Sequence, residues 1–212
     1  VWDTFDPNNV TLNSPDPQAI RPPGEPANVL QVTLPTNFKC ATFSNDAYNQ
    51  ILRQLETDVS NARFATPEGP IELPVKLKVH DSLFVPLAKW AMLLAGNYRC
   101  VTADGMRNTQ DAVHANLDES KSVYNFVVDL CIKLGSNPAD LVPFEKYAAA
   151  AQSLSRPASA ARALQNGAPY IERADKLVQL IARSKGMSHP AIDAQVALVD
   201  RRLEANRQKL ST

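Results

Sequence analysis

The sequence is poor in the residues from which most catalytic loops and metal sites are built. Its 212 residues include only seven glycines, no two of them close together, and only three histidines. A glycine-rich phosphate loop, a G-x-S-x-G turn, an H-E-x-x-H motif and an EF-hand loop are all missing from the sequence. We therefore predict no catalytic residues and no cofactor, and we infer function from the organisation of the chain.

Cysteine is also scarce, and its spacing argues against both disulfides and a zinc site. Cys40, Cys100 and Cys131 are odd in number, lie far apart and form no Cys-x-x-Cys pair. Unpaired cysteines are among the most frequently buried residues. The sequence therefore predicts three reduced, buried thiols, which favours a reducing compartment.

Long apolar runs and a net charge are missing as well. No run of about 18 apolar residues occurs; the nearest candidate, residues 83–96, is short and contains Lys89, so we interpret it as a core helix. Basic and acidic residues balance at 22 each, which argues against a strongly basic nucleic-acid binder. The charge is nevertheless uneven. Residues 1–35 hold four acidic residues and one arginine, whereas residues 156–212 hold ten basic and five acidic residues.

The first 35 residues have the composition of an extended arm. Seven of the 16 prolines lie in residues 1–35, which prevents a helix of useful length. Apolar anchors are scattered along this polar segment, although disordered tails are usually poor in such residues. The anchors are Trp2, Phe5, Val10, Leu12 and Ile20. We therefore predict that the arm docks on a surface, either its own or that of a neighbouring subunit.

The rest of the chain has mainly helical periodicity, with apolar residues three or four positions apart. One stripe lies in the middle of the chain, at Val123, Phe126, Val127, Leu130, Cys131 and Leu134. The last helix has a stripe that is more typical of a core than of a partner-binding face, at Ile192, Val196, Val199, Leu203 and Leu210.

Two short segments alternate apolar and polar residues instead. They lie at about 28–35 and 71–79 and predict a small β element, in which the two segments could pair as a hairpin. The predicted fold is therefore mainly α. An extended Pro-rich N-terminal arm (1–35) precedes a helical bundle-like domain (36–212) with a small β element.

One group of residues has the chemistry of a metal site. Asp111, His114 and Asp118 are three and four residues apart, so a continuous helix would place two carboxylates and an imidazole on one face. The competing interpretation, which we favour, is a solvated helix surface with Asp118 as a helix cap. His189, just before Pro190, is interpreted as a surface residue at a helix start.

The basic C-terminal third carries the only electrostatic indication of nucleic-acid binding. Arg156, Arg162, Arg201 and Arg202 could follow a phosphate backbone. The alternative is that these arginines lie on ordinary solvated faces and pair with nearby acids such as Asp200.

This organisation predicts a non-enzymatic structural subunit of a large assembly. The interpretation we prefer is a self-assembling viral coat or nucleocapsid-type protein, found in the virion or cytoplasm, whose arm docks on neighbouring subunits. In a homopolymer, many weak phosphate contacts add along RNA, so a near-neutral chain suffices. The layout of an arm before a helical body looks like that of filamentous-virus coat proteins, a likeness of organisation with no matching motif.

Two alternatives remain open. The chain could be an accessory subunit of a hetero-oligomeric complex, for example in an organelle, where removal of a targeting peptide would explain the start at Val1. It could also be a small metal-dependent enzyme, an alternative that is supported only by Asp111, His114 and Asp118.

Deletion of residues 1–35 should abolish assembly and leave the helix content nearly intact, because the apolar anchors that dock on neighbours lie there. Size-exclusion chromatography with light scattering measures the first effect and circular dichroism the second. A truncated chain that assembles normally would contradict the role of the arm.

Overall fold

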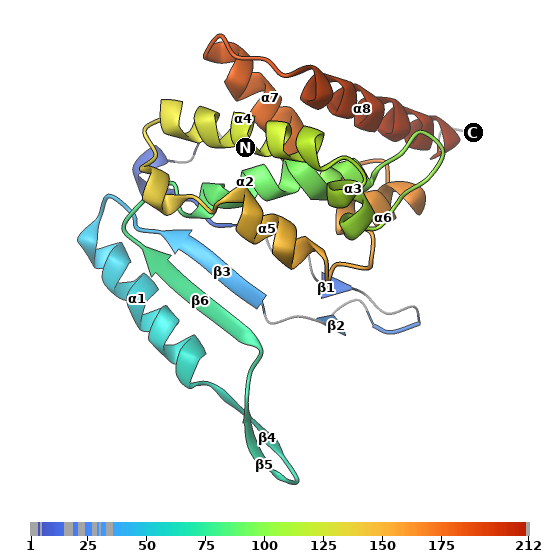
Figure 1. Cartoon of the computed structure of the whole chain (residues 1–212). Coiled ribbons are helices and arrows are strands. Elements are labelled where there is room, and N and C mark those ends of the chain that lie inside the picture. The colour runs from blue at the N-terminus through green and yellow to red at the C-terminus, as the bar shows by residue number, and fades with distance from the viewer. Residues whose placement is uncertain are drawn as a thin grey trace. The chain divides into compact units, whose positions relative to one another are not determined.

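The structure is a computed structural model that describes residues 4, 6–14, 19–20, 24–26, 29, 31–32 and 36–210. The chain forms two compact units, residues 1–87 and 88–212 (Figure 1). The predicted mainly helical fold with a small β element is confirmed. The boundary between arm and body at residue 35 stays a prediction, because much of the arm lies outside the described residues.

The first unit is built around two parallel strands, β3 (Thr36–Ala41) and β6 (Val75–His80). Parallel neighbours need a crossover connection, because the chain must return to the end where the first strand began. Here α1 (Asp46–Asn61) and the hairpin of β4 (Arg63–Thr66) and β5 (Gly69–Glu72) supply it. The helix lies along β6 and the hairpin projects beyond the end of that strand (Figure 1).

The predicted strand pairing is wrong. Strand β2 (Gln31–Val32) pairs antiparallel with β1 (Ala19–Ile20), whereas β6 pairs with β3. The predicted single strand at 71–79 is divided between β5 and β6, and Pro74 lies at the division. Proline has no backbone N–H to donate to a neighbouring strand, so a strand tends to be interrupted there.

Part of the predicted arm adds to this sheet. The Ser14 N–H donates to the Lys39 carbonyl at 2.8 Å, and the Ala41 N–H donates to the Leu12 carbonyl at 2.9 Å. The Thr11 hydroxyl also donates to the Ala41 carbonyl at 2.9 Å. Residues 11–14 therefore lie antiparallel beside β3, on the chain's own surface.

The second unit is helical. Its α-helices are α2 (Lys89–Met92), α3 (Thr109–His114), α4 (Leu117–Lys133), α5 (Phe144–Ala151), α6 (Ser159–Gln165), α7 (Ala174–Ser184) and α8 (Pro190–Leu210). The π-helical turn η4 (Leu93–Asn97) and the 3-10 turns η5 (Tyr98–Cys100) and η6 (Pro138–Asp140) complete it. Helices α7 and α8 pack side by side (Figure 1). The predicted core helix at 83–96 begins later than its first residue, because the chain first becomes helical in the 3-10 turn η3 (Pro86–Ala88), where proline is favoured at a first turn.

The core of the second unit follows the predicted stripes. Val123, Val127 and Leu130 of α4 are buried, as are Val196 and Val199 of α8. The last position of the α8 stripe, Leu210, is 69% exposed, so the stripe faces the core only up to Leu203.

Aromatic side chains tie the middle of this core together. Tyr124 stacks on Tyr147 at 5.5 Å between ring centroids and meets Phe144 edge-on at 5.4 Å. Each phenol donates to a carbonyl, Tyr124 to Val142 at 2.8 Å and Tyr147 to Met92 at 3.1 Å. Burial raises the pKa of Tyr124 to about 12, so the phenol stays protonated and can keep donating.

Asparagine residues begin four helical segments of the chain. The side-chain oxygens of Asn45, Asn108, Asn116 and Asn137 accept hydrogen bonds from the first turns of α1, α3, α4 and η6. Such caps satisfy N–H groups that have no partner inside the helix. The predicted cap Asp118 instead lies within the first turn of α4, one residue after that helix begins.

The three cysteines are free and buried, as predicted. Burial raises the pKa of Cys131 to about 11 and also raises the pKa of Cys100. Among the described residues, no helix combines the length and apolar character needed to cross a membrane.

Gly96 in η4 is the glycine with the least space around it. A Cβ there would clash with the Tyr147 hydroxyl and lie 3.2 Å from Val113 Cγ2. Gly96→Ala should therefore lower the free energy of unfolding by about 1–3 kcal/mol, as overpacking usually does. Gly105→Ala is the matched control, because the nearest atom to its Cβ would be 3.9 Å away.

Urea unfolding of a double-mutant cycle with Tyr147→Phe measures this effect, since phenylalanine lacks the clashing oxygen. The loss of unfolding free energy caused by Gly96→Ala should be smaller in the Tyr147→Phe background than in the native chain. Equal costs with and without that second substitution would contradict the clash.

Candidate functional site

A cleft of about 360 Å³ lies within the helical unit. Its lining comes from segments far apart in the sequence: η4 and η5, the loop after η5, α4, α7 and α8. Leu94, Val123, Ile192 and Leu198 form apolar parts of the wall. The polar lining residues are Tyr98, Arg99, Arg107, Glu119, Asp175, Gln195 and Arg201.

Arg99 is a buried arginine whose positive charge is paired with a carboxylate. Its side chain is 8% exposed, and Nη2 lies 2.5 Å from Glu119 Oε2, while Nε donates to the Ala112 carbonyl at 3.3 Å. A buried guanidinium needs such a carboxylate, because removal from water is costly for an unpaired charge. Arg99 and Glu119 therefore form one neutral pair at the cleft.

The loop after η5 is held in place by Arg202. Arg202 Nη1 donates to the Thr102 carbonyl at 2.8 Å and to the Gly105 carbonyl at 3.0 Å, and Nη2 donates to Gln165 at 2.9 Å. This anchoring positions Arg107, whose Nε donates to the Arg99 carbonyl at 2.9 Å. The two terminal nitrogens of Arg107 make no hydrogen bond or ion pair with the described residues.

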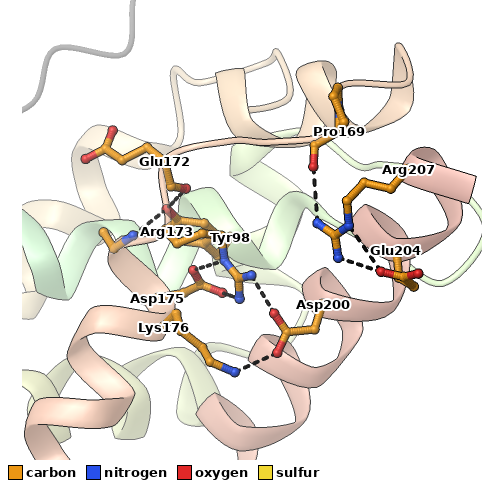
Figure 2. Close-up of polar contacts among 10 residues, drawn as sticks. Tyr98, Pro169, Glu172, Arg173, Asp175, Lys176, Asp200, Glu204 and Arg207 are labelled. Atoms are coloured by element: carbon orange, nitrogen blue, oxygen red, sulfur yellow. Dashed lines mark hydrogen bonds and ion pairs between the residues drawn. The ribbon is translucent and has the colours of Figure 1, made fainter. Parts of the chain in front are cut away.

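An ion-pair network holds α7 against α8 beside the cleft (Figure 2). Arg173 meets the buried Asp175 through two nitrogens, at 2.8 and 3.0 Å, and reaches Asp200 of α8 with Nη1 at 2.5 Å. Lys176 also donates to Asp200, at 2.7 Å. Burial alone would raise the pKa of Asp200, but the hydrogen bonds from Lys176 and Arg173 lower it below its usual 3.8.

Tyr98 joins the start of α7 to η5. Its hydroxyl donates to the Glu172 carbonyl at 2.6 Å and accepts from the Ala174 N–H at 2.9 Å (Figure 2). Burial raises the pKa of this phenol, and the nearby Asp175 carboxylate raises it further. Tyr98 therefore stays protonated, and able to donate, above the usual pKa of a tyrosine.

Two residues of α8 leave polar groups unused at the cleft. The amide nitrogen of Gln195 is buried and has no hydrogen-bond partner within the part of the chain that the structure describes. Arg201 is exposed, and its guanidinium contacts no carboxylate among the described residues. These groups, with Arg107, are the ones available to a ligand.

The four predicted arginines do not form one site. Arg202 holds the loop after η5, and Arg162 donates from Nη1 to the Pro157 carbonyl at 2.6 Å. Arg201 lines the cleft, whereas Arg156 is exposed and is not part of the lining. Of the four, only Arg156 and Arg201 have guanidinium groups that make no contact with other described residues.

The predicted metal group does not assemble on one helix face. Asp111 and His114 lie on α3, while Asp118 lies on α4, because the chain breaks its helix between them. Asp111 accepts from Asn108 Nδ2 at 2.8 Å, and His114 Nε2 lies 3.0 Å from the Ala148 carbonyl oxygen. Among the described residues, no three His, Cys, Asp or Glu side chains could hold a metal ion together.

His189 immediately precedes α8, where the sequence predicted a helix start. Its Nδ1 accepts from the Ala191 N–H at 3.2 Å, and its Nε2 lies 3.1 Å from the Ser122 hydroxyl. The ring also meets Phe126 edge-on at 5.3 Å. These contacts give His189 a structural role.

The predicted docking residues of the arm are only partly described. Trp2, Phe5 and the side chain of Ile20 lie outside the described residues. Val10 is 53% and Leu12 39% exposed, so both keep apolar surface that a neighbour could cover. Docking of these residues on a neighbour stays a prediction.

A larger exposed apolar surface lies on α1. This helix has no fully buried residue, although its apolar stripe is well formed. Leu52 and Val59 are half-buried, whereas Tyr48, Ile51 and Leu55 on the same stripe are exposed. We call Tyr48, Ile51 and Leu55 the α1 face.

The β4–β5 hairpin carries a second exposed apolar pair. Phe64 and Ile71 are directly opposite in the register and are 60% and 52% exposed. Opposite residues of a hairpin share one face. A lone two-stranded hairpin is only marginally stable in water, so this pair would gain from a covering partner.

No protein-family model matches the chain, and no curated protein or solved structure matches it. The site must therefore be judged on its own geometry.

Sequence reasoning missed Arg99, Arg107 and Gln195. Only Arg107 carried a signal: it lies in the loop after η5, which has no periodicity, and loops of that kind often carry binding residues. A glutamine near the apolar stripe of the last helix gave no warning that its amide would be buried.

The two aspartates of the network should differ in their contribution to stability. Asp175→Asn should lower the free energy of unfolding by about 3 kcal/mol, since it removes the buried carboxylate that pairs with the half-buried Arg173. Asp200→Asn should cost about 1 kcal/mol or less, because that carboxylate is 42% exposed. Asp104→Asn, an exposed loop position, is the control for urea unfolding at pH 7.

The Asp200 contribution should also depend on pH. The pKa of Asp200 is lower in the folded chain than its usual value of 3.8. Its contribution to the free energy of unfolding is therefore complete above pH 3.8 and disappears as the pH falls through the folded-state pKa. The difference between the native chain and Asp200→Asn should shrink on acidification. A difference that grows would show that Asp200 is not held in its charged form.

Proposed function

We propose that the chain is a non-enzymatic structural subunit of a large assembly, of the self-assembling viral coat or nucleocapsid type, acting in the virion or cytoplasm. The observation that carries the proposal is the α1 face together with the Phe64–Ile71 pair. Apolar side chains of this size have a lower free energy when they are buried than when they face water. Exposed apolar patches on a folded chain often mark protein–protein contacts.

The geometry gives a reason why α1 is left uncovered. Its apolar stripe is wide, but the sheet beneath it is narrow: among the described residues it consists of β3, β6 and the short segment 11–14 beside β3. Leu52 and Val59 use that narrow surface, and the remaining stripe needs another chain. A second copy is the partner we propose, because docking of identical subunits would bury every copy of this face.

Nucleic acid is the second partner in the proposal. Two of the predicted arginines, Arg156 and Arg201, make no hydrogen bond or ion pair through their guanidinium groups with other described residues, so they are the ones that could contact phosphates. One or two contacts per subunit are weak, but they add along a polymer.

Ile51→Glu should convert the assembly to monomers, because it places a charge in the centre of the α1 face. Gln50→Glu is the matched control: it adds the same charge at the adjacent exposed position of α1. Size-exclusion chromatography with light scattering and absorbance at two wavelengths, for protein and for nucleic acid, measures both size and bound nucleic acid. Assembly should persist in the control.

The outcomes separate the candidate functions. A native chain that is monomeric at every concentration would contradict self-assembly and leave an accessory subunit of a hetero-oligomeric complex as the better account. Equal loss of assembly in both variants would show that added charge, and not the α1 face, is responsible.

The role of the arm can be tested without disturbing β3. Because residues 11–14 pair with β3, deletion of residues 1–35 also removes a contact inside the chain. Deletion of residues 1–9 removes Trp2 and Phe5 and keeps that pairing, so it is the sharper form of the truncation.

A further inference from the structure

The cleft of the helical unit contains more positive charge than its own carboxylates neutralise. Glu119 is paired with Arg99, and Asp175 is paired with Arg173. Arg107 and Arg201 have no carboxylate partner among the described residues, although both line the cleft. The two remaining cations favour an anionic ligand.

Gln195 adds a second, independent indication. Its amide nitrogen is buried at the cleft and has no acceptor in the described part of the chain. A buried donor without a partner is unfavourable, and most native proteins avoid it or satisfy it with a ligand or water. An acceptor oxygen or nitrogen on a bound molecule would satisfy this donor.

The size and the apolar wall restrict the ligand further. The volume of about 360 Å³ falls in the range of small organic ligands. Leu94, Val123, Ile192 and Leu198 offer an apolar surface to its body. A bare inorganic anion would leave this surface uncovered.

We propose that the cleft binds a nucleoside phosphate. Arg107 and Arg201 would share the phosphate. Its several oxygens can accept hydrogen bonds from two guanidinium groups at once, and a single carboxylate, with two oxygens, is less suited to this. The nucleoside would lie on the apolar wall and offer an acceptor to Gln195. The site lies within one chain and needs no second copy, so the proposal goes beyond self-assembly and can fail or succeed independently of it.

Isothermal titration calorimetry at low salt on the full chain tests the proposal. The probes are adenosine monophosphate, adenosine, inorganic phosphate and a short single-stranded oligoadenylate without a terminal phosphate. Adenosine monophosphate should bind about tenfold or more tightly than adenosine, since hydrogen bonds between charged groups are lost with the phosphate.

Three variants locate the binding. Arg201→Gln and Gln195→Leu should each weaken binding by about tenfold. Lys146→Gln, which removes an exposed cation of α5 outside the cleft, should leave affinity within about twofold. Gln195→Leu removes an unsatisfied donor, so its thermal midpoint should not fall, which separates lost binding from lost folding.

The probes also distinguish the two sources of the phosphate. Binding of the mononucleotide but not the oligomer identifies a free nucleotide, and the reverse identifies a nucleic-acid strand; either supports the proposal if the cleft variants weaken it. Failure of both nucleotide probes to bind would overturn it. So would an equal loss of affinity in Lys146→Gln and Arg201→Gln.

Discussion

The helical unit depends on a single buried phenol. The Tyr98 hydroxyl bridges two backbone groups at the start of α7, so η5 and α7 are joined across more than seventy residues of chain. Once α7 is fixed there, Arg173 and Asp175 can reach α8 through Asp200. Arg99, the next residue after Tyr98, also lines the cleft. One hydroxyl group, with both of its bonding roles filled by backbone, therefore holds together two segments that line the cleft.

The sequence predicted those features of the fold that depend on neighbouring residues alone. The stripes of α4 and α8 follow from periodicity alone, because a helix buries residues at fixed spacing. The pairing of β3 with β6 could not be predicted, since it joins residues 36–41 to 75–80 and each strand has only six residues. The helix break between His114 and Asp118 depends on Asn116, a short side chain that caps α4.

The roles of residues at the candidate site were still harder to predict from the sequence. Arg201 and Arg202 are adjacent and equally basic, yet one faces the cleft and the other holds a loop about a hundred residues earlier in the chain. Adjacent helical residues point about 100° apart, so composition could not separate them. What decides between them is the position of Thr102 and Gly105, which is a property of the folded chain.

The π-helical turn η4 has a consequence for how the protein tolerates change in length. The wide turn sets the angle at which the chain leaves η4, and Tyr98 and Arg99 follow it directly. Loss of one residue here would turn everything downstream by about 100° around the helix axis. The phenol bridge and the Arg99–Glu119 pair would then be lost together. Substitutions in this turn cost packing, but an insertion or deletion would change which side chains face the interior, so the length of this short segment is more constrained than its composition.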